Sequence, residues 1–188
     1  MADPRRLYFG FLAVSIPAFL YTLFYFLATE AGGAPSTFKP WLAIPIEDYF
    51  AYDRFLVAMS VYFGWILTAG VIQLLSRFFS GKGSFEDNLA AFGFGVGVAS
   101  LVSLAHDLPD AILGFFGVID MQAYEAALNS PTIWRTILWI FYSVYLIAIP
   151  ALFSIGLRVA QRLRIGPAIL LGLVGFLIYQ LFFLLFNR

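Results

Sequence analysis

Hydrophobic residues of this chain are gathered in five long stretches, and charged residues are confined to the connections between them. The stretches cover residues 7–29, 55–76, 88–105, 136–157 and 165–187, and none of them contains Asp, Glu, Lys, Arg or His. A helix needs roughly 20 apolar residues to cross about 30 Å of hydrocarbon. The pattern therefore predicts an all-α polytopic membrane protein, a bundle of five transmembrane helices.

Composition leaves little chain for anything else. Of 188 residues, 62% are hydrophobic and 12% are charged, and the mean hydropathy is +0.89. We therefore expect a single integral membrane domain over residues 1–188. The first stretch is too long and too aromatic for a cleavable signal and is predicted to be a retained span. The absence of cysteine excludes disulfides, thiolate metal sites and cysteine catalysis.

The charges are distributed unequally between the two sides that five spans would create. One side carries seven basic and three acidic residues: Arg5, Arg6, Arg77, Lys82, Arg158, Arg162, Arg164, Asp3, Glu86 and Asp87. The other carries four basic and eight acidic residues: Lys39, Arg54, Arg135, Arg188, Glu30, Glu47, Asp48, Asp53, Asp107, Asp110, Asp120 and Glu125. Basic residues in short loops stay on the cytoplasmic side. The N-terminus is therefore predicted to be cytoplasmic and the C-terminus outside.

A short turn joins the second and third stretches, with the sequence Gly81, Lys82, Gly83, Ser84 and Phe85. The two glycines permit a tight reversal, and Ser84 is predicted to cap a helix that starts at Phe85. A phosphate-binding loop would need a preceding strand and a second glycine at the Walker spacing. In addition, acidic residues follow at the helix end that would bind the anion. We therefore predict no nucleotide binding.

Small side chains recur through the third stretch, at Ala91, Gly93, Gly95, Gly97, Ala99 and Ser103. Small residues let helix backbones approach closely in a membrane, where apolar burial gives little driving force. The spacing predicts close helix packing and a central position for this span. The same positions could line a narrow pore, although its only polar side chains would be two serines, Ser100 and Ser103.

The only histidine of the chain stands beside two carboxylates, as His106, Asp107 and Asp110. The three side chains could supply part of a divalent-cation site if other acidic residues were folded towards them. They could equally be polar residues that close the outer end of a helix. We predict no catalytic residue and no bound metal here, and we keep the three as weak metal candidates.

A proline follows this cluster, and an uncharged run of residues 111–119 comes after it. Proline is expected to end the third span at Pro109. The run that follows is too short to cross a bilayer. We predict that it forms a short interfacial or re-entrant helix.

The turn and the residues after it carry a family resemblance. Residues 74–85 read LLSRFFSGKGSF, and residues 90–94 read AAFGF. This segment resembles the bacterial branch of the Yip1 family, in which a Gly-Lys-Gly-Ser-Phe type turn precedes an aromatic-small-aromatic stretch. The family's Gly-Tyr stands here as Gly93-Phe94, Val98 stands near its usual proline, and the long cytosolic N-terminal segment of eukaryotic members is absent.

The resemblance implies a non-enzymatic membrane scaffold or adaptor with a role in membrane organisation or trafficking, in a bacterial cytoplasmic membrane. The implied partners are the lipid bilayer and either further copies of the chain or another membrane protein. No cofactor, nucleotide or nucleic acid is expected. The alternative is an uncoupled transporter or channel for a small or lipidic solute, because no span contains an ionisable side chain that could couple transport to ions.

Overall fold

The structure is a computed structural model that describes residues 5–35 and 41–187, and helices make up most of that chain. Its elements are α1 (Arg5–Glu30), the short 3-10 helix η1 (Ile46–Asp48), α2 (Tyr49–Arg77), α3 (Phe85–Phe115), α4 (Met121–Leu128), α5 (Ile133–Ala160) and α6 (Ile165–Asn187). The predicted all-α class is confirmed.

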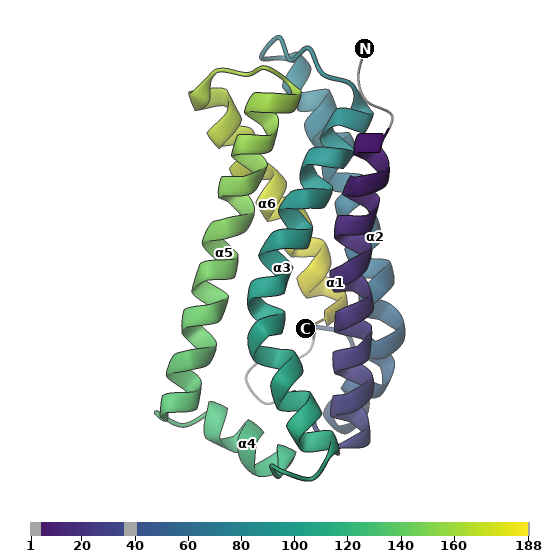
Figure 1. Ribbon diagram of the computed structural model, residues 1–188, viewed down its shortest axis with the longest axis vertical. Helices are drawn as coiled ribbons and strands as arrows, with labels where there is room; N and C mark the ends of the chain where they lie inside the picture. Colours follow the sequence, from purple (N-terminus) through teal and green to yellow (C-terminus); the bar gives the residue numbers. More distant parts are fainter. Residues whose placement is uncertain (1–4, 36–40, 188) are drawn as a thin grey trace.

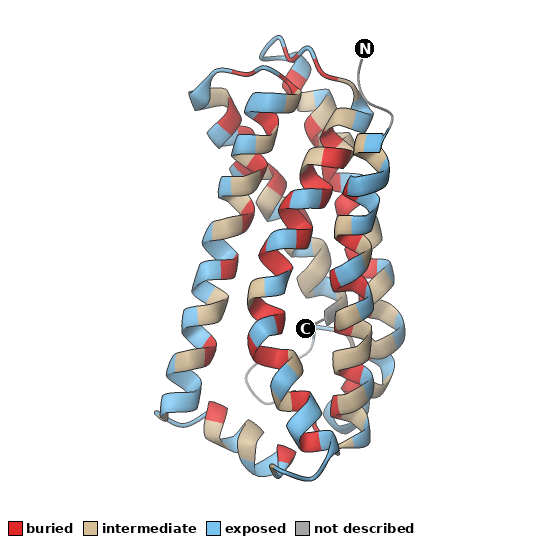
Figure 2. Ribbon diagram, viewed as in Figure 1, coloured by how far each residue is buried: buried red, intermediate tan, exposed pale blue. Residues whose placement is uncertain are grey.

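Five helices, α1, α2, α3, α5 and α6, run roughly along the long axis of the molecule (Figure 1). All five are long and apolar enough to cross a membrane, as the sequence predicts. Each packs against two others in the cyclic order α1, α3, α5, α6, α2, and α3 also contacts α2. Many residues on the outward-facing sides of these helices are exposed (Figure 2). They include large apolar residues such as Phe63 and Ile147. Lipid tails are the natural partners for such a surface.

The third long helix extends well beyond its predicted end. α3 continues through Pro109 to Phe115, so the prediction that Pro109 ends this span is wrong. Proline removes the backbone hydrogen bond to the residue four positions earlier, which is Ala105. Both residues are exposed, so the proline ring meets no neighbouring helix. Membrane helices accommodate proline where local adjustment satisfies the freed carbonyl.

The short helix after the third span is also displaced from its predicted place. Residues 111–115 belong to α3, and the short helix is α4, which connects α3 to α5 at one end of the bundle (Figure 1). Asp120 caps α4, because its carboxylate accepts hydrogen bonds from the backbone N–H groups of Gln122 and Ala123. This Asp residue is the local signal for the start of α4.

α3 approaches its neighbours closely through its glycines. Gly93 lies against the backbone carbonyl of Gly10, and Gly97 against that of Ala13, so α1 and α3 cross almost backbone to backbone. Gly95 faces α5, where an added Cβ would lie 2.8 Å from the ring of Phe153. About half of the residues of α3 are buried, more than in any other described helix.

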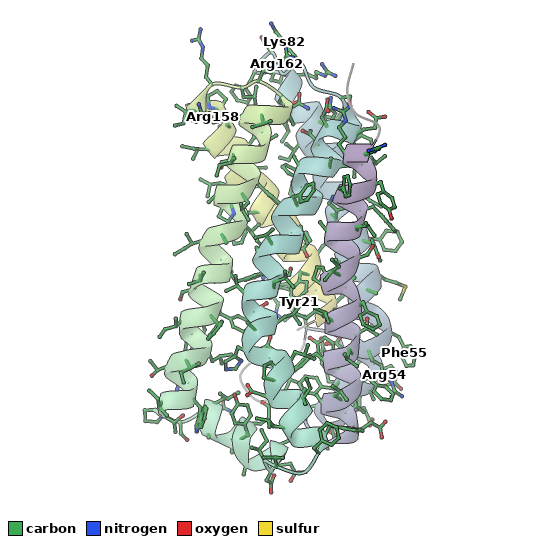
Figure 3. All side chains as sticks on the ribbon, viewed as in Figure 1. Tyr21, Arg54, Phe55, Lys82, Arg158 and Arg162 are labelled. Carbon is green, nitrogen blue, oxygen red and sulfur yellow. The ribbon has the colours of Figure 1, made fainter. Side chains whose placement is uncertain are left out.

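The charged residues separate towards the two ends of the bundle. We call one end the basic end; it holds the start of α1, the α2–α3 turn and the α5–α6 turn, and Lys82, Arg158 and Arg162 lie there (Figure 3). We call the opposite end, with η1 and α4, the acidic end. Asp3, Lys39 and Arg188, which also enter the predicted charge asymmetry, lie outside the described residues.

Candidate functional site

A cavity of about 280 Å³ lies inside the bundle towards the acidic end. Its walls come from all six described α-helices, with α2 contributing Phe50, and they are mostly apolar and aromatic, with Phe24, Leu138 and Phe183 among them. Cavities that bind small molecules have volumes of about 300 to 1,000 Å³. This cavity is therefore close to the lower end of the range in which ligands are bound.

The cavity reaches the side of the bundle beside α5. Trp139 and Leu146 both line the cavity and are exposed. Across from them, α6 contributes its last turns, and it ends well before the acidic end is reached (Figure 1). Since Trp139 and Leu146 are both lining and exposed, the cavity comes to the outer surface of the bundle at α5.

The histidine and aspartates of the predicted cluster lie together on the cavity wall. Nδ1 of His106 is 2.9 Å from Oδ1 of Asp107 and 3.5 Å from Oδ2 of Asp110. The other oxygen of Asp107 accepts a hydrogen bond of 3.1 Å from the hydroxyl of Tyr142 on α5. His106 and Asp107 are buried, so this polar group belongs to the interior and does not simply close a helix end.

Helix α4 completes the cluster from the acidic end. The hydroxyl of Tyr124 donates a hydrogen bond of 2.5 Å to Oδ2 of Asp110 and lies 3.4 Å from Nε2 of His106. Burial, followed by the hydrogen bond to Asp110, raises the pKa of Tyr124 far above its usual range. The phenol therefore keeps its proton and remains a donor to the carboxylate. Glu125, the next residue, also lines the cavity.

Deeper in the cavity, the polar side chains are paired with one another. The hydroxyls of Tyr21 and Ser103 are 2.6 Å apart, and the hydroxyl of Tyr145 donates to Oε1 of Gln180 at 3.1 Å. These groups have their hydrogen-bond partners already, so the deep wall offers a ligand mainly apolar surface. The polar groups that can meet a ligand's headgroup are those of the His106 cluster.

An aromatic layer closes the bundle beyond the cavity, on the side of the basic end. The rings of Phe92 and Phe153 stack with centroids 4.2 Å apart, and Tyr179 packs edge-on against Phe153. All three are fully buried, and none lines the cavity. The cavity therefore ends inside the bundle and does not continue as a pore through this layer.

The described carboxylates are not grouped as a set of metal ligands. Among residues 5–35 and 41–187, no group of three or more His, Asp or Glu side chains is placed to hold a metal ion. In the cluster, His106 and the two aspartates direct their polar atoms at one another and at tyrosine hydroxyls. Chemically, the cluster presents negative charge and hydrogen-bond acceptors to the cavity.

The residues of the family-like turn lie at the basic end, far from the cavity. Ser84 forms a capping box with Asp87 at the start of α3, which confirms the predicted cap and the predicted start at Phe85. Gly83 packs against the backbone carbonyl of Ala160 at the end of α5, where no Cβ could be placed. The turn thus docks onto the α5–α6 connection. Lys82, Phe85 and Phe94 are exposed.

A network of buried amides stabilises this docking, and no local pattern in the sequence predicts it. The side chain of Gln161 is fully buried: its Oε1 accepts from the backbone N–H of Gly83 at 3.0 Å. Its Nε2 donates to Gln73 at 2.7 Å and to Asn88 at 3.0 Å. Asn88 in turn donates to Gln73 at 2.9 Å. The network joins α2, α3 and the α5–α6 turn.

The small residues of α3 contact neighbouring helices. Gly93 and Gly97 meet α1, Gly95 and Ala91 meet α5, and Ser103 bonds with Tyr21 of α1. Ala99 is fully buried. A shallow groove along α3 and α5 near the basic end is lined in part by Ala91 and Gly95. These small residues therefore serve contacts between helices. Ser103 is the one member of the set that lines the aromatic cavity.

Several residues of the cavity cannot be recognised as site residues from the sequence. Tyr124, Tyr142 and Trp139 lie far from His106 in sequence, and tyrosine and tryptophan near span ends are explained well enough by the membrane interface. Glu125 stands out in the sequence only as one of several acidic residues between the uncharged stretches. The usable signal was the acidic cap Asp120, which predicts a helix carrying Tyr124 and Glu125 back over the bundle.

Comparisons with known proteins found no relative: no family model, no curated protein and no solved structure matches this chain. The resemblance to the Yip1 family therefore stays a prediction.

Proposed function

We propose that this protein binds a lipid-like molecule in the cavity near the acidic end of its membrane-spanning bundle. The observation that carries the proposal is the combination, in one cavity, of apolar walls, exposed lining residues on α5, and a polar cluster under α4. A hydrocarbon chain fits the first feature, entry from the bilayer fits the second, and a polar headgroup fits the third.

The alternative function that the sequence indicates is a transporter or channel for a small or lipidic solute. The present proposal keeps the lipidic molecule and replaces transport by binding. The aromatic layer of Phe92, Phe153 and Tyr179 favours a binding site over an open channel, because it closes the bundle beyond the cavity. The adaptor function implied by the Yip1 resemblance, a partner in the membrane, and the absence of enzymatic activity stay predictions.

Saturable binding of a simple amphiphile is the direct test. The protein in amphipols is titrated with dodecylammonium, dodecanol and dodecanoate, which share one chain, and bound molecules are counted by native mass spectrometry. We expect at least one of the three to bind at one site per chain. The substitution Leu138→Trp fills the cavity, because Leu138 is buried on its wall, and it is expected to lower that affinity at least about tenfold.

The matched control is Ile140→Trp, which adds the same indole to the same helix. Ile140 is exposed and does not line the cavity, so binding should be unchanged. Equal binding to the parent protein and to Leu138→Trp, or no saturable binding of any of the three probes, would overturn the proposal.

The proposal includes an orientation. The basic residues of the α2–α3 and α5–α6 turns support a cytoplasmic basic end in a bacterial cytoplasmic membrane, which would place the cavity in the outer leaflet. The bundle contains no cysteine, so single cysteines can report on each end without background.

Cysteines at Ser80 and Arg162, at the basic end, are expected to be shielded from a membrane-impermeant maleimide in intact cells. Cysteines at Gln122 and Ser130, at the acidic end, are expected to react. All four positions are exposed in the structure, so differences in labelling report the side of the membrane. After the cells are opened, all four should react. Labelling of Ser80→Cys in intact cells would reverse the orientation.

A further inference from the structure

The charged side chains that line the cavity are strongly biased towards negative charge. They are the carboxylates of Asp107, Asp110 and Glu125, against the single imidazole of His106, and within residues 5–35 and 41–187 no Lys or Arg lines the cavity. Even a fully protonated imidazole leaves three carboxylates facing one positive charge. A cation entering this space would be attracted, and an anion repelled.

The two arginines that the structure describes near this end are engaged elsewhere. Arg54 pairs with Glu30, with Nη1 3.8 Å from the carboxylate, and its guanidinium lies 5.0 Å from the ring centre of Phe55. Arg135 donates from Nη1 to the backbone carbonyl of Asn129 at 3.2 Å. Neither arginine lines the cavity. The negative charge of the cluster is therefore not neutralised by a neighbouring arginine on the cavity wall.

Aromatic rings surround the same polar cluster. Tyr124, Tyr142 and Trp139 line the cavity together with the carboxylates. The hydroxyls of the two tyrosines point to Asp110 and Asp107, at 2.5 and 3.1 Å, which fixes both rings at the edge of the cluster. Rings around a carboxylate group are the setting in which ammonium groups bind, because the ring face and the carboxylate both attract the cation.

We infer that the ligand of the cavity is an amphiphile whose headgroup is an organic cation, a primary amine or a quaternary ammonium. The inference rests on the proposed function and adds to it the chemistry of the headgroup. The ammonium group lies against Asp107, Asp110 and Glu125 beneath α4, and the chain runs along the apolar wall of α5 and α6. A bare metal ion fits less well, because no three His, Asp or Glu side chains of the described residues are placed to hold one, whereas the aromatic rings can face an organic cation.

The test compares the three chain-matched probes individually, so that only the headgroup charge varies. Dodecylammonium is expected to bind at least about tenfold more tightly than dodecanol, and dodecanoate more weakly than both. A tenfold change corresponds to about 1.4 kcal/mol, near the lower end of the coupling found between close charges. Asp110→Asn keeps the shape of the side chain and an acceptor for Tyr124, and should lower the affinity for dodecylammonium about tenfold while leaving that for dodecanol unchanged.

Two further variants keep the result interpretable. Glu125→Gln should act in the same direction as Asp110→Asn, so the inference can still be tested if Asp110→Asn does not fold. Glu47→Gln removes an exposed carboxylate of the acidic end that does not line the cavity, and it should leave all three affinities unchanged.

The outcomes separate this inference from the proposed function. If dodecanol or dodecanoate binds as tightly as dodecylammonium and binding is lost in Leu138→Trp, the cavity is a lipid site but the cationic headgroup is wrong. The inference is also overturned if calcium or zinc competes with dodecylammonium and raises the melting temperature of the parent protein, because the cluster would then be an inorganic cation site. Failure of all three probes overturns both statements.

Discussion

Gly93→Ala and Gly97→Ala are each expected to lower the free energy of unfolding by about 2 kcal/mol, within the range for overpacked sites. A methyl group at either position would overlap a backbone carbonyl of α1, that of Gly10 or of Ala13. A backbone atom cannot turn aside as a flexible side chain can, so α1 would have to move away from α3. Moving α1 away from α3 also separates many other contacts between the two helices. One added methyl group therefore lowers the stability of the whole bundle.

The measurement is unfolding in mixed micelles with increasing dodecyl sulfate, and Gly70→Ala is the control. Gly70 lies within α2, and a methyl group there would meet only a ring carbon of Phe85, at 3.8 Å. Alanine is the better helix former by up to about 1 kcal/mol, so this variant should be as stable as the parent protein or more so. If Gly93→Ala and Gly97→Ala were equally stable, the close crossing of α1 and α3 would be contradicted.

Gln161→Leu is expected to cost about 3 kcal/mol of stability, because it leaves several buried polar groups without partners. The backbone N–H of Gly83 loses its acceptor, and Asn88 loses the donor to its side-chain carbonyl. Leucine is similar in size, so the loss is one of hydrogen bonding more than of volume. The α2–α3 turn should also become susceptible to proteolysis, since its docking onto the α5–α6 turn depends on this side chain.

Gln122→Leu is the matched control for this substitution. Gln122 is exposed on α4, and the hydrogen bond it makes to Asp120 comes from its backbone. Its replacement should change the unfolding free energy by less than about 0.5 kcal/mol. Similar stabilities for the two variants would mean that the amide network contributes nothing measurable at the basic end.

The five spans were predictable because lipid imposes a strict rule on sequence: a long uncharged run has one stable form in hydrocarbon. The helix ends were less predictable, because polar and charged residues can continue a membrane helix when other helices supply their hydrogen-bond partners. α3 continues past Ala105 since His106, Asp107 and Asp110 are bonded to α4 and α5. Pro109 is tolerated because it lies on the exposed side of the helix. Neither fact is visible in the local sequence.

The site was predictable only in part, for a similar reason. A lone histidine beside two aspartates is conspicuous in an apolar chain, so His106, Asp107 and Asp110 were found. The residues that give the cluster its setting come from other helices, and no local pattern links Tyr124 or Tyr142 to them. Gln73, Asn88 and Gln161 were missed because each is a single amide near a helix end, where one polar residue is unremarkable. Only their meeting in space makes them a network.

The amide network also bears on the cavity, because α5 runs from one to the other. At its basic end α5 is held by the buried Gln161, and nearer its other end by the hydrogen bond from Tyr142 to Asp107. A helix of its length, 28 residues, spans about 42 Å. The cavity wall that α5 provides, with Leu138 on it, is therefore positioned by attachments at opposite surfaces of the bundle, and a substitution at Gln161 can reach the cavity without touching it.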